Sequence, residues 1–307
     1  ADGGLIFRCL YRYNIKISPA LNDLRNIGMH REIPALPATR CGNTVFNWGE
    51  RTYVMGIVNV SPDSFSGDGL DNVDSAIAQA KLFIRQGADI IDIGGESTRP
   101  DSKPISEEEE IARVVPVIKA LSSQVSVPIS IDTYKSSVAI SAVKAGANLI
   151  NDVWGLKKCP ELAEIAAEAK IPIIITSNQR DEPSRDIISA ITFDLEDKIR
   201  LAENSGVKPE NIIIDPGIGF GKTAEQNLEI IGRLSELKCL KKPLLLGTSR
   251  KSFIGKVLDL PENQRFEGTA ATVAIGIANG ADIVRVHDVQ QIVRVCRMSD
   301  AIIRRKE

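Results

Sequence analysis

The feature that most constrains the fold is an alternation of short apolar runs with segments of helical spacing. The runs are rich in Ile and Val, and each ends in polar or glycine residues. They cover residues 53–60, 89–93, 127–131, 147–150, 172–175, 211–214, 243–246 and 281–286. Continuous apolar runs of this length are typical of strands buried on both faces, as in a parallel sheet covered by crossover helices.

The segments between these runs carry apolar residues three and four positions apart, which predicts amphipathic helices. Examples are residues 72–86, 106–122, 160–169, 193–204 and 224–237. Eight strand–helix units in about 250 residues match the size of a closed barrel, whereas a doubly wound open sheet more often has five or six strands. We therefore predict the α/β class and a single (β/α)8 TIM-type barrel, whose active site forms at the carboxyl ends of the strands.

The first 50 residues lack this alternation. We expect residues 1–40 to form an N-terminal extension, partly disordered, and residues 41–307 to form the barrel domain. At the start of that domain, apolar and polar residues alternate over positions 41–51, around Val45, Phe46 and Trp48. This alternation predicts a small hairpin that closes the barrel bottom.

Composition argues against several classes of partner. The chain has 38 Lys and Arg against 40 Asp and Glu, so its net charge indicates neither nucleic acid nor a membrane surface. No apolar run reaches the roughly 18 residues of a membrane span, and the N-terminus lacks the pattern of a signal peptide. The 5 cysteines lie far apart without a C-x-x-C pair, which is typical of a reducing compartment. We expect a soluble, cytoplasmic protein.

Two common catalytic motifs are disfavoured. Only His30 and His287 occur, which excludes a metal site of several imidazoles and leaves few candidates for a Ser-His-Asp triad. The glycine-rich stretch 215–222 ends like a P-loop, but a P-loop needs glycine five residues before Gly221, and Pro216 stands there.

Polar residues gather at the ends of the predicted strands. Carboxylates follow apolar runs directly at Asp132, Asp152 and Asp215. Each alone could be a helix cap, yet together they indicate a site, because buried charge is costly unless it is used or paired. Cations follow other runs, in numbers that could hold a diphosphate; they are Lys222, Arg250, Lys251, Arg285 and His287. For Arg250 alone, a structural interpretation, as a solvated loop residue or a salt-bridge partner, is the stronger one.

Four segments resemble dihydropteroate synthase. They are Met-Gly-Ile-Val-Asn-Val-Ser-Pro-Asp-Ser-Phe-Ser at 55–66, Asp-Ile-Gly-Gly-Glu-Ser-Thr-Arg-Pro at 92–100, the stretch 215–222, and Ser-Arg-Lys at 249–251. With Asp132, Asn151-Asp152 and Arg-Val-His-Asp at 285–288 in the family's order, the resemblance covers roughly residues 42–300.

The resemblance implies an activity and its ligands. The family condenses 6-hydroxymethyl-7,8-dihydropterin pyrophosphate with p-aminobenzoate, giving 7,8-dihydropteroate and pyrophosphate in folate biosynthesis, and sulfonamides imitate the aminobenzoate. The pterin methylene becomes cation-like before the amine attacks, so the site must stabilise a leaving anion more than supply a strong base. The resemblance also implies a magnesium ion on the diphosphate, with Asn59 as its protein ligand.

Carried over residue by residue, the resemblance gives four sets of site residues. The catalytic set is Lys251, Asp215, Arg285 and His287. The pterin set is Asp132, Asn151, Asp215 and Lys251. The pyrophosphate set is Asn59, Arg285 and His287. The p-aminobenzoate set is Phe65, Thr98, Arg99, Pro100, Phe220 and Ser252. The chemistry agrees, because the paired ring N–H and amine of a pterin suit a carboxylate such as Asp215.

The chain departs from the family pattern at three places. The first loop reads Gly67-Asp68 where the family has Asp-Gly, and Asp101 replaces the glycine after Ser-Thr-Arg-Pro. Thr-Ser-Asn-Gln at 176–179 replaces the usual Met-His-Met, which removes an apolar wall and a histidine near the pterin.

Two other functions stay open. Barrels that bind methyltetrahydrofolate and transfer its methyl group look similar around the Asp and Asn positions, but they do not need the cations of 249–251 and 285–287. A catalytically silent pterin-binding barrel is suggested only by the altered loops and the extension. Apolar residues near the C-terminus, Ile292, Val293 and Val295, indicate either an exposed homodimer surface or burial against the barrel.

Overall fold

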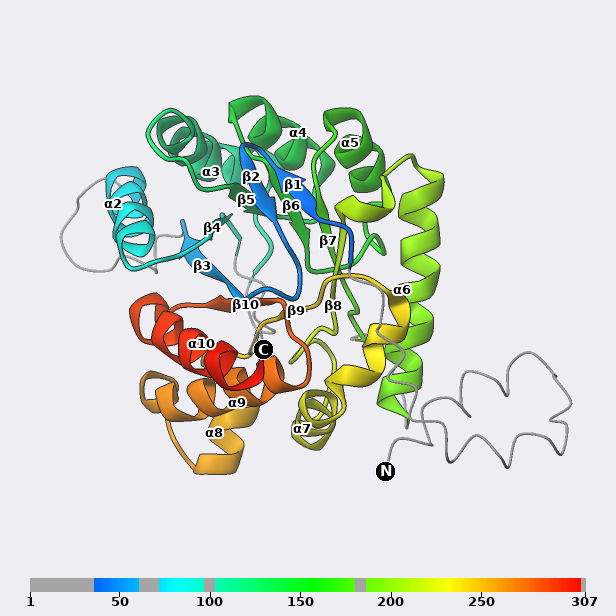
Figure 1. Cartoon of the computed structure of the whole chain (residues 1–307). Helices are drawn as coiled ribbons and strands as arrows, with labels where there is room; N and C mark the ends of the chain where they lie inside the picture. The colour runs from blue at the N-terminus through cyan, green and yellow to red at the C-terminus, as the bar shows by residue number, and fades with distance from the viewer. Residues whose placement is uncertain (1–35, 61–71, 97–102, 180–185, 305–307) are drawn as a thin grey trace, which may run out of the picture. The chain divides into compact units, whose positions relative to one another are not determined.

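Eight parallel strands form one sheet that closes into a barrel (Figure 1). The strands are β3 (Tyr53–Asn59), β4 (Ile90–Gly94), β5 (Ile129–Asp132), β6 (Leu149–Asp152), β7 (Ile173–Thr176), β8 (Ile212–Asp215), β9 (Leu245–Leu246) and β10 (Ile283–Val286). Their order is β8-β7-β6-β5-β4-β3-β10-β9. Ile214 bridges to Leu244, next to β9, which joins the two ends of this order and closes the barrel.

This computed structural model describes residues 36–60, 72–96, 103–179 and 186–304. All eight predicted strands are confirmed, and each bound lies within two residues of the expected one. Several strands run one or two residues past the apolar run, because polar residues such as Asp132 and Asp215 still pair with the neighbouring strand. Leu36–Glu307 form one compact unit, and the expected extension falls almost wholly outside the described residues.

Helices surround the barrel (Figure 1). They are α2 (Asn72–Arg85), α3 (Glu107–Ser122), α4 (Ser136–Ala145), α5 (Glu161–Ala169), α6 (Ile187–Asn204), α7 (Ala224–Gly232), α8 (Ser252–Leu258), α9 (Phe266–Ala278) and α10 (Val289–Ile303). The five predicted helices are confirmed with two changes. The helix α6 begins earlier than expected, because the Asp186 side chain caps it, and the segment expected at 224–237 divides into α7 and a 3-10 helix (Leu234–Leu240).

The barrel bottom is filled by apolar side chains and covered by a hairpin. Its strands β1 (Thr39–Cys41) and β2 (Thr44–Phe46) pair antiparallel, which confirms the predicted hairpin. Phe46 and Trp48 stack with ring centroids 5.5 Å apart. They belong to one buried cluster with a layer of inward-facing strand residues, Met55, Ile90, Leu149, Ile174, Ile213, Leu245 and Ile283.

The next inward layer is largely polar. Side chains of a strand alternate between its two faces, so residues two positions beyond the apolar layer also point inward. These are Ile57, Asp92, Asn151, Thr176, Asp215, Gly247 and Arg285. The apolar layer therefore lies below this polar layer, which faces the carboxyl ends of the strands. We call the carboxyl-terminal end of the barrel, with its polar layer, the rim.

The apolar residues exposed on the C-terminal helices are not the three that the sequence analysis considered. Ile292 and Val293 are buried against the barrel, and Val295 packs partly against it, so the alternative of burial is confirmed for all three. Exposed large apolar side chains are Ile275 on α9, at 51%, and Met298, Ile302 and Ile303 on α10, at 63%, 61% and 44%. None of the described helices is both long and apolar enough to cross a membrane.

Candidate active site

Four polar residues from separate strands meet inside the barrel. Arg285 on β10 donates from Nε to Asp92 Oδ2 and from Nη2 to Asp132 Oδ2, each over 2.6 Å. Asn151 Nδ2 donates to the same Asp92 oxygen over 3.1 Å. The sequence placed Asp132, Asn151 and Arg285 at this rim, and the structure brings them together.

The two carboxylates of this group are buried and incompletely paired. Asp92 is 0% exposed and Asp132 7%. Burial raises the pKa of Asp132 to about 7, against the attraction of Arg285, and the charge of Asp92 raises it further. Asp92 Oδ1 and Asp132 Oδ1 have no hydrogen-bond partner among the described residues. Buried acceptors without partners are uncommon, so these oxygens are available to a ligand that donates N–H groups.

Asp215 lies at the end of β8 with one oxygen already engaged. Its Oδ1 accepts the backbone N–H of Gly217 over 2.7 Å. Gly217 has a φ of +73°, and a Cβ there would lie 2.0 Å from the carbonyl oxygen of Ser177. Only glycine therefore fits this turn. Burial raises the pKa of Asp215, against the Gly217 hydrogen bond and the nearby charges of Lys251 and Lys222.

The ammonium group of Lys222 is engaged by the backbone. Its Nζ donates to three backbone carbonyls, those of Ser177 at 2.7 Å, Gly217 at 3.0 Å and Phe220 at 3.3 Å. Burial lowers its pKa to about 7. Its interpretation as a phosphate-binding cation is therefore wrong for this structure, because Lys222 holds the turn after β8 together.

Lys251 and Phe220 lie side by side at the rim. Lys251 Nζ donates to the carbonyl of Ile218 over 2.5 Å and sits 4.4 Å from the centroid of the Phe220 ring. Phe220 is 8% exposed. This pair gives the rim a flat apolar face beside a cation and close to the Asp215 carboxylate.

His287 and Arg250 have different surroundings although they follow neighbouring strands. His287 Nδ1 lies 2.9 Å from Ser249 Oγ, and the His287 backbone N–H donates to that hydroxyl over 3.2 Å. Arg250 pairs through Nε and Nη2 with both oxygens of Asp288. Of the two structural alternatives expected for Arg250, the salt bridge is therefore confirmed.

Two further predicted residues face solvent. Asn59 is exposed at the end of β3. Its Oδ1 and the Cβ of Asp132 lie on the same side of Gly94, each 3.6 Å from the position that a Cβ added to Gly94 would take. Ser252 is exposed at the first position of α8. Within the described ranges, no three His, Cys, Asp or Glu side chains are grouped to hold a metal ion.

The remaining predicted residues lie outside the described part of the chain. They are Phe65, Thr98, Arg99 and Pro100, together with the departures Gly67, Asp68 and Asp101. The departure at 176–179 is described and is buried: Asn178 Nδ2 donates to the Val153 carbonyl over 2.9 Å, and Ser177 Oγ donates to Asp194 over 2.7 Å. The side chains of Ser177 and Asn178 thus bond to the protein itself.

Two features were missed by sequence reasoning. Asp92 was quoted as part of a motif but given no role, although a carboxylate inside the run Ile-Ile-Asp-Ile at 90–93 is a signal of a buried pair. Lys135 was missed entirely. Its Nζ contacts Glu96 and Glu110, each over 2.7 Å, and the Ile105 carbonyl over 2.8 Å.

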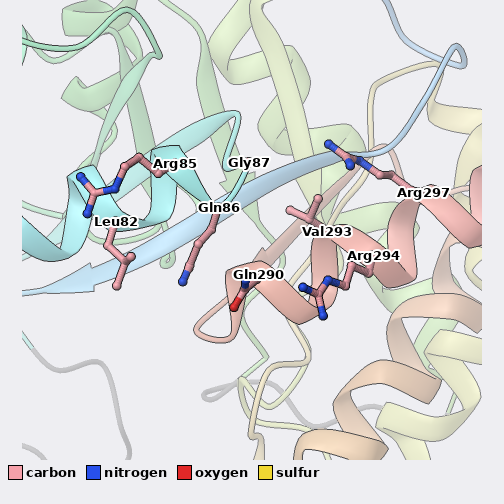
Figure 2. A pocket seen from close by; sticks show the side chains of 8 residues that line it. All are labelled: Leu82, Arg85, Gln86, Gly87, Gln290, Val293, Arg294 and Arg297. Carbon is pink, nitrogen blue, oxygen red and sulfur yellow. The ribbon is translucent and has the colours of Figure 1, made fainter.

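A separate surface pocket is lined by residues at the end of α2 and on α10 (Figure 2). It measures about 360 Å³ and lies between the end of α2 and the helix α10. Its lining consists of Leu82, Arg85, Gln86, Gly87, Gln290, Val293, Arg294 and Arg297. None of these residues belongs to the polar layer, so the rim remains the candidate site.

The chain matches the family of pterin binding enzymes over residues 55–287. The dihydropteroate synthase of Clostridium beijerinckii is 53% identical over 268 residues, which is 87% of this chain and 100% of the relative. That of Bacillus subtilis is 51% identical over 261 residues, 85% of this chain and 92% of the relative.

Solved structures give the same picture. A crystal structure of a Clostridium difficile dihydropteroate synthase in the presence of pteroic acid has a TM-score of 0.82 and 51% identity, and covers 85% of this chain and 100% of its own. The Xanthomonas albilineans dihydropteroate synthase with 4-aminobenzoic acid has a TM-score of 0.83 and 37% identity, over 87% and 98%.

Proposed function

The chain belongs to the dihydropteroate synthases, transferases of folate biosynthesis, and we propose how the residues at its rim divide the work of the reaction. One substrate is 6-hydroxymethyl-7,8-dihydropterin pyrophosphate, the other is p-aminobenzoate, and the products are 7,8-dihydropteroate and pyrophosphate. The observation that carries the assignment of roles is the buried polar group at the rim, in which one oxygen each of Asp92 and Asp132 has no hydrogen-bond partner among the described residues.

The pterin binds to Asp132, Asn151, Asp215 and Lys251 in this proposal. Asp132 Oδ1 and Asp215 Oδ2 are acceptors for the ring N–H and the exocyclic amine. Lys251 supplies a donor for the ring acceptors, and its closeness to the Phe220 ring provides a flat surface for the pterin. Support comes from burial, since hydrogen bonds to charged groups are strongest where water is excluded.

The diphosphate binds to Arg285 and His287. Arg285 engages the two carboxylates through Nε and Nη2, which leaves its Nη1 edge for an anion. His287 comes two residues later along the chain, at the mouth of the barrel. Together they stabilise the charge that develops as pyrophosphate departs, so Lys251, Asp215, Arg285 and His287 are the catalytic set. No strong base is required of this chain.

The residues at the rim are compatible with a magnesium ion that is bound mainly by the diphosphate of the substrate. Asn59 offers one exposed amide oxygen at the rim, close to Asp132, and Mg²⁺ commonly takes one or two protein oxygens along with substrate phosphates and water. When bound, the ion would neutralise part of the diphosphate charge. Asn59 would hold it at the mouth of the barrel.

The aminobenzoate binds beside the pterin. Phe220 borders this region from the turn after β8, and Ser252 begins α8 just beyond Lys251. Phe65, Thr98, Arg99 and Pro100 complete this set by family resemblance. Sulfonamides would occupy the same place.

The assembly is proposed to be a homodimer in the cytoplasm. Ile275, Met298 and Ile302 are exposed on the adjacent helices α9 and α10, and covering them would remove apolar surface from water. The 4 cysteines in the described residues form no disulfide, in keeping with a reducing compartment. Sedimentation at micromolar concentration tests the dimer, and a single species near the monomer mass of 33.4 kDa would contradict it.

Pyrophosphate release tests the function directly. Purified protein receives the pterin pyrophosphate and Mg²⁺, with and without p-aminobenzoate. We expect release that depends on p-aminobenzoate, with dihydropteroate as product. Binding of the pterin without release would favour a silent barrel, and methyl transfer from methyltetrahydrofolate would favour the methyltransferase.

A further inference from the structure

Asp92 is the one carboxylate of the rim group that lies within an apolar strand. It stands among isoleucines in β4, and its side chain is 0% exposed. A buried carboxylate is unfavourable unless it is paired, so its partners explain its presence. Those partners are Arg285 and Asn151, which come from β10 and β6.

The contact with Asn151 fixes the direction of an amide. A carboxylate only accepts hydrogen bonds, so the Asn151 group that faces Asp92 at 3.1 Å must be the NH₂. The Asn151 oxygen must then point away from Asp92. Asp92 thereby decides that Asn151 offers an acceptor, and not a donor, on its other side.

The contact with Arg285 fixes the plane of a guanidinium. Asp92 takes Nε and Asp132 takes Nη2, each at 2.6 Å, so both carboxylates lie along one edge of the planar group. Nη1 has no hydrogen-bond partner among the described residues. One oxygen, Asp92 Oδ2, thus orients both Arg285 and Asn151.

From this arrangement we propose that Asp92 is a positioning residue that couples the pterin-binding half of the site to the diphosphate-binding half. The inference rests on the proposed function, which gives Asn151 to the pterin and Arg285 to the diphosphate. Asp92 orients the two groups from beneath the site. Losing it would therefore weaken recognition of both halves of the same substrate.

The test is a mutant cycle on binding of the pterin pyrophosphate with Mg²⁺, measured by titration calorimetry on the full chain. Asp92→Ala should weaken binding about 10- to 100-fold, because it removes the oxygen that accepts from both Arg285 Nε and Asn151 Nδ2, and a hydrogen bond to a charged group is lost. In an Arg285→Ala background, and separately in an Asn151→Ala background, the same substitution should have an effect at least about threefold smaller. A merely structural role would not produce this dependence.

Asp282→Ala is the matched control. Asp282 is also a buried carboxylate, 8% exposed, and it precedes β10 at the opposite end of the barrel, where it accepts the backbone N–H of Leu244. The fold-changes in dissociation constant caused by this control substitution and by Arg285→Ala should multiply in the double variant, as expected for two independent sites. If Asp92→Ala does not fold, Asp92→Leu replaces it, because Leu fills the space of the side chain without offering an acceptor to Arg285 or Asn151.

Two outcomes overturn the proposal. One is unchanged binding in a folded Asp92 variant, and the other is an Asp92 effect that multiplies with both Arg285→Ala and Asn151→Ala. Failure of the proposed function would look different, because the wild-type chain itself would then show no p-aminobenzoate-dependent release of pyrophosphate.

Discussion

Arg285 Nη2 and Asp132 Oδ2 lie 2.6 Å apart and join β10 to β5 across the barrel interior. These strands are not neighbours in the sheet, since β3 and β4 stand between them. The same guanidinium also faces Asp92, so one cation balances two buried carboxylates. Burial is the main cause that raises the pKa of Asp132 to about 7. Ligand recognition at this rim should therefore respond to pH near neutrality.

Pterin affinity is expected to fall as pH drops through about 7, because protonation removes acceptor capacity from Asp132. The contribution of Asp132 to the free energy of unfolding should have the opposite pH dependence and decrease as pH rises. A folded pKa raised above the unfolded value of 3.8 means that the Asp132 contribution is fully present below about pH 4 and is lost as pH rises through about 7. Calorimetric titration across this range, in wild type and in Asp132→Asn, measures the binding effect. A wild-type affinity that stays flat between about pH 6 and 8 would contradict it.

Asp215→Asn should weaken pterin binding by about 1.5–3 kcal/mol. The Gly217 N–H already binds Oδ1 at 2.7 Å, so the substituted amide would keep its oxygen there and turn its NH₂ toward the donors of the pterin. Titration with the pterin pyrophosphate measures the change. Asp152→Asn serves as the comparison, since its two oxygens accept backbone N–H groups of Trp154 and Leu156 and it should alter stability more than affinity. An unchanged dissociation constant in Asp215→Asn would remove Asp215 from the site.

The sequence predicts much of this site because strand position and side-chain type are both local properties. Asp132, Asn151 and Asp215 follow apolar runs, and parallel strands must bring their carboxyl ends to one rim. The contacts of Lys222, by contrast, could not be predicted from local sequence. Its contacts depend on a turn at Gly217 that folds back on the chain after β7, which no spacing along the sequence reveals.

Asp92 illustrates a second limit. Its position inside a buried strand could be seen, but its partners come from β6 and β10, far away along the chain. Only the closed barrel puts these strands across from one another. Charge pairs that cross a barrel interior therefore need the three-dimensional structure.

Lys135→Met should cost about 3–5 kcal/mol of unfolding free energy. Lys135 is the cation between Glu96 and Glu110, whose side chains are 9% and 1% exposed, and removing it leaves two buried carboxylates without a compensating positive charge. Urea unfolding measures the loss. Lys158→Met is the matched control: this exposed lysine lies 3.7 Å from the Trp154 ring centroid, and its loss should cost about 1 kcal/mol or less. Equal losses in the two variants would show that the buried network does not stabilise the fold.

Gly217→Ala should destabilise the protein and weaken pterin binding together. The φ of +73° disfavours any side chain, and the added Cβ would lie 2.0 Å from the Ser177 carbonyl oxygen, which is backbone and cannot move aside. The turn would shift and withdraw the N–H that holds Asp215 Oδ1. Gly232→Ala in α7 is the control, because a Cβ there meets nothing within 4 Å, and it should be neutral or stabilise by up to about 1 kcal/mol. Thermal unfolding measures the stability of both variants, and titration with the pterin pyrophosphate measures their affinity. Wild-type affinity in Gly217→Ala would mean that this turn does not position Asp215.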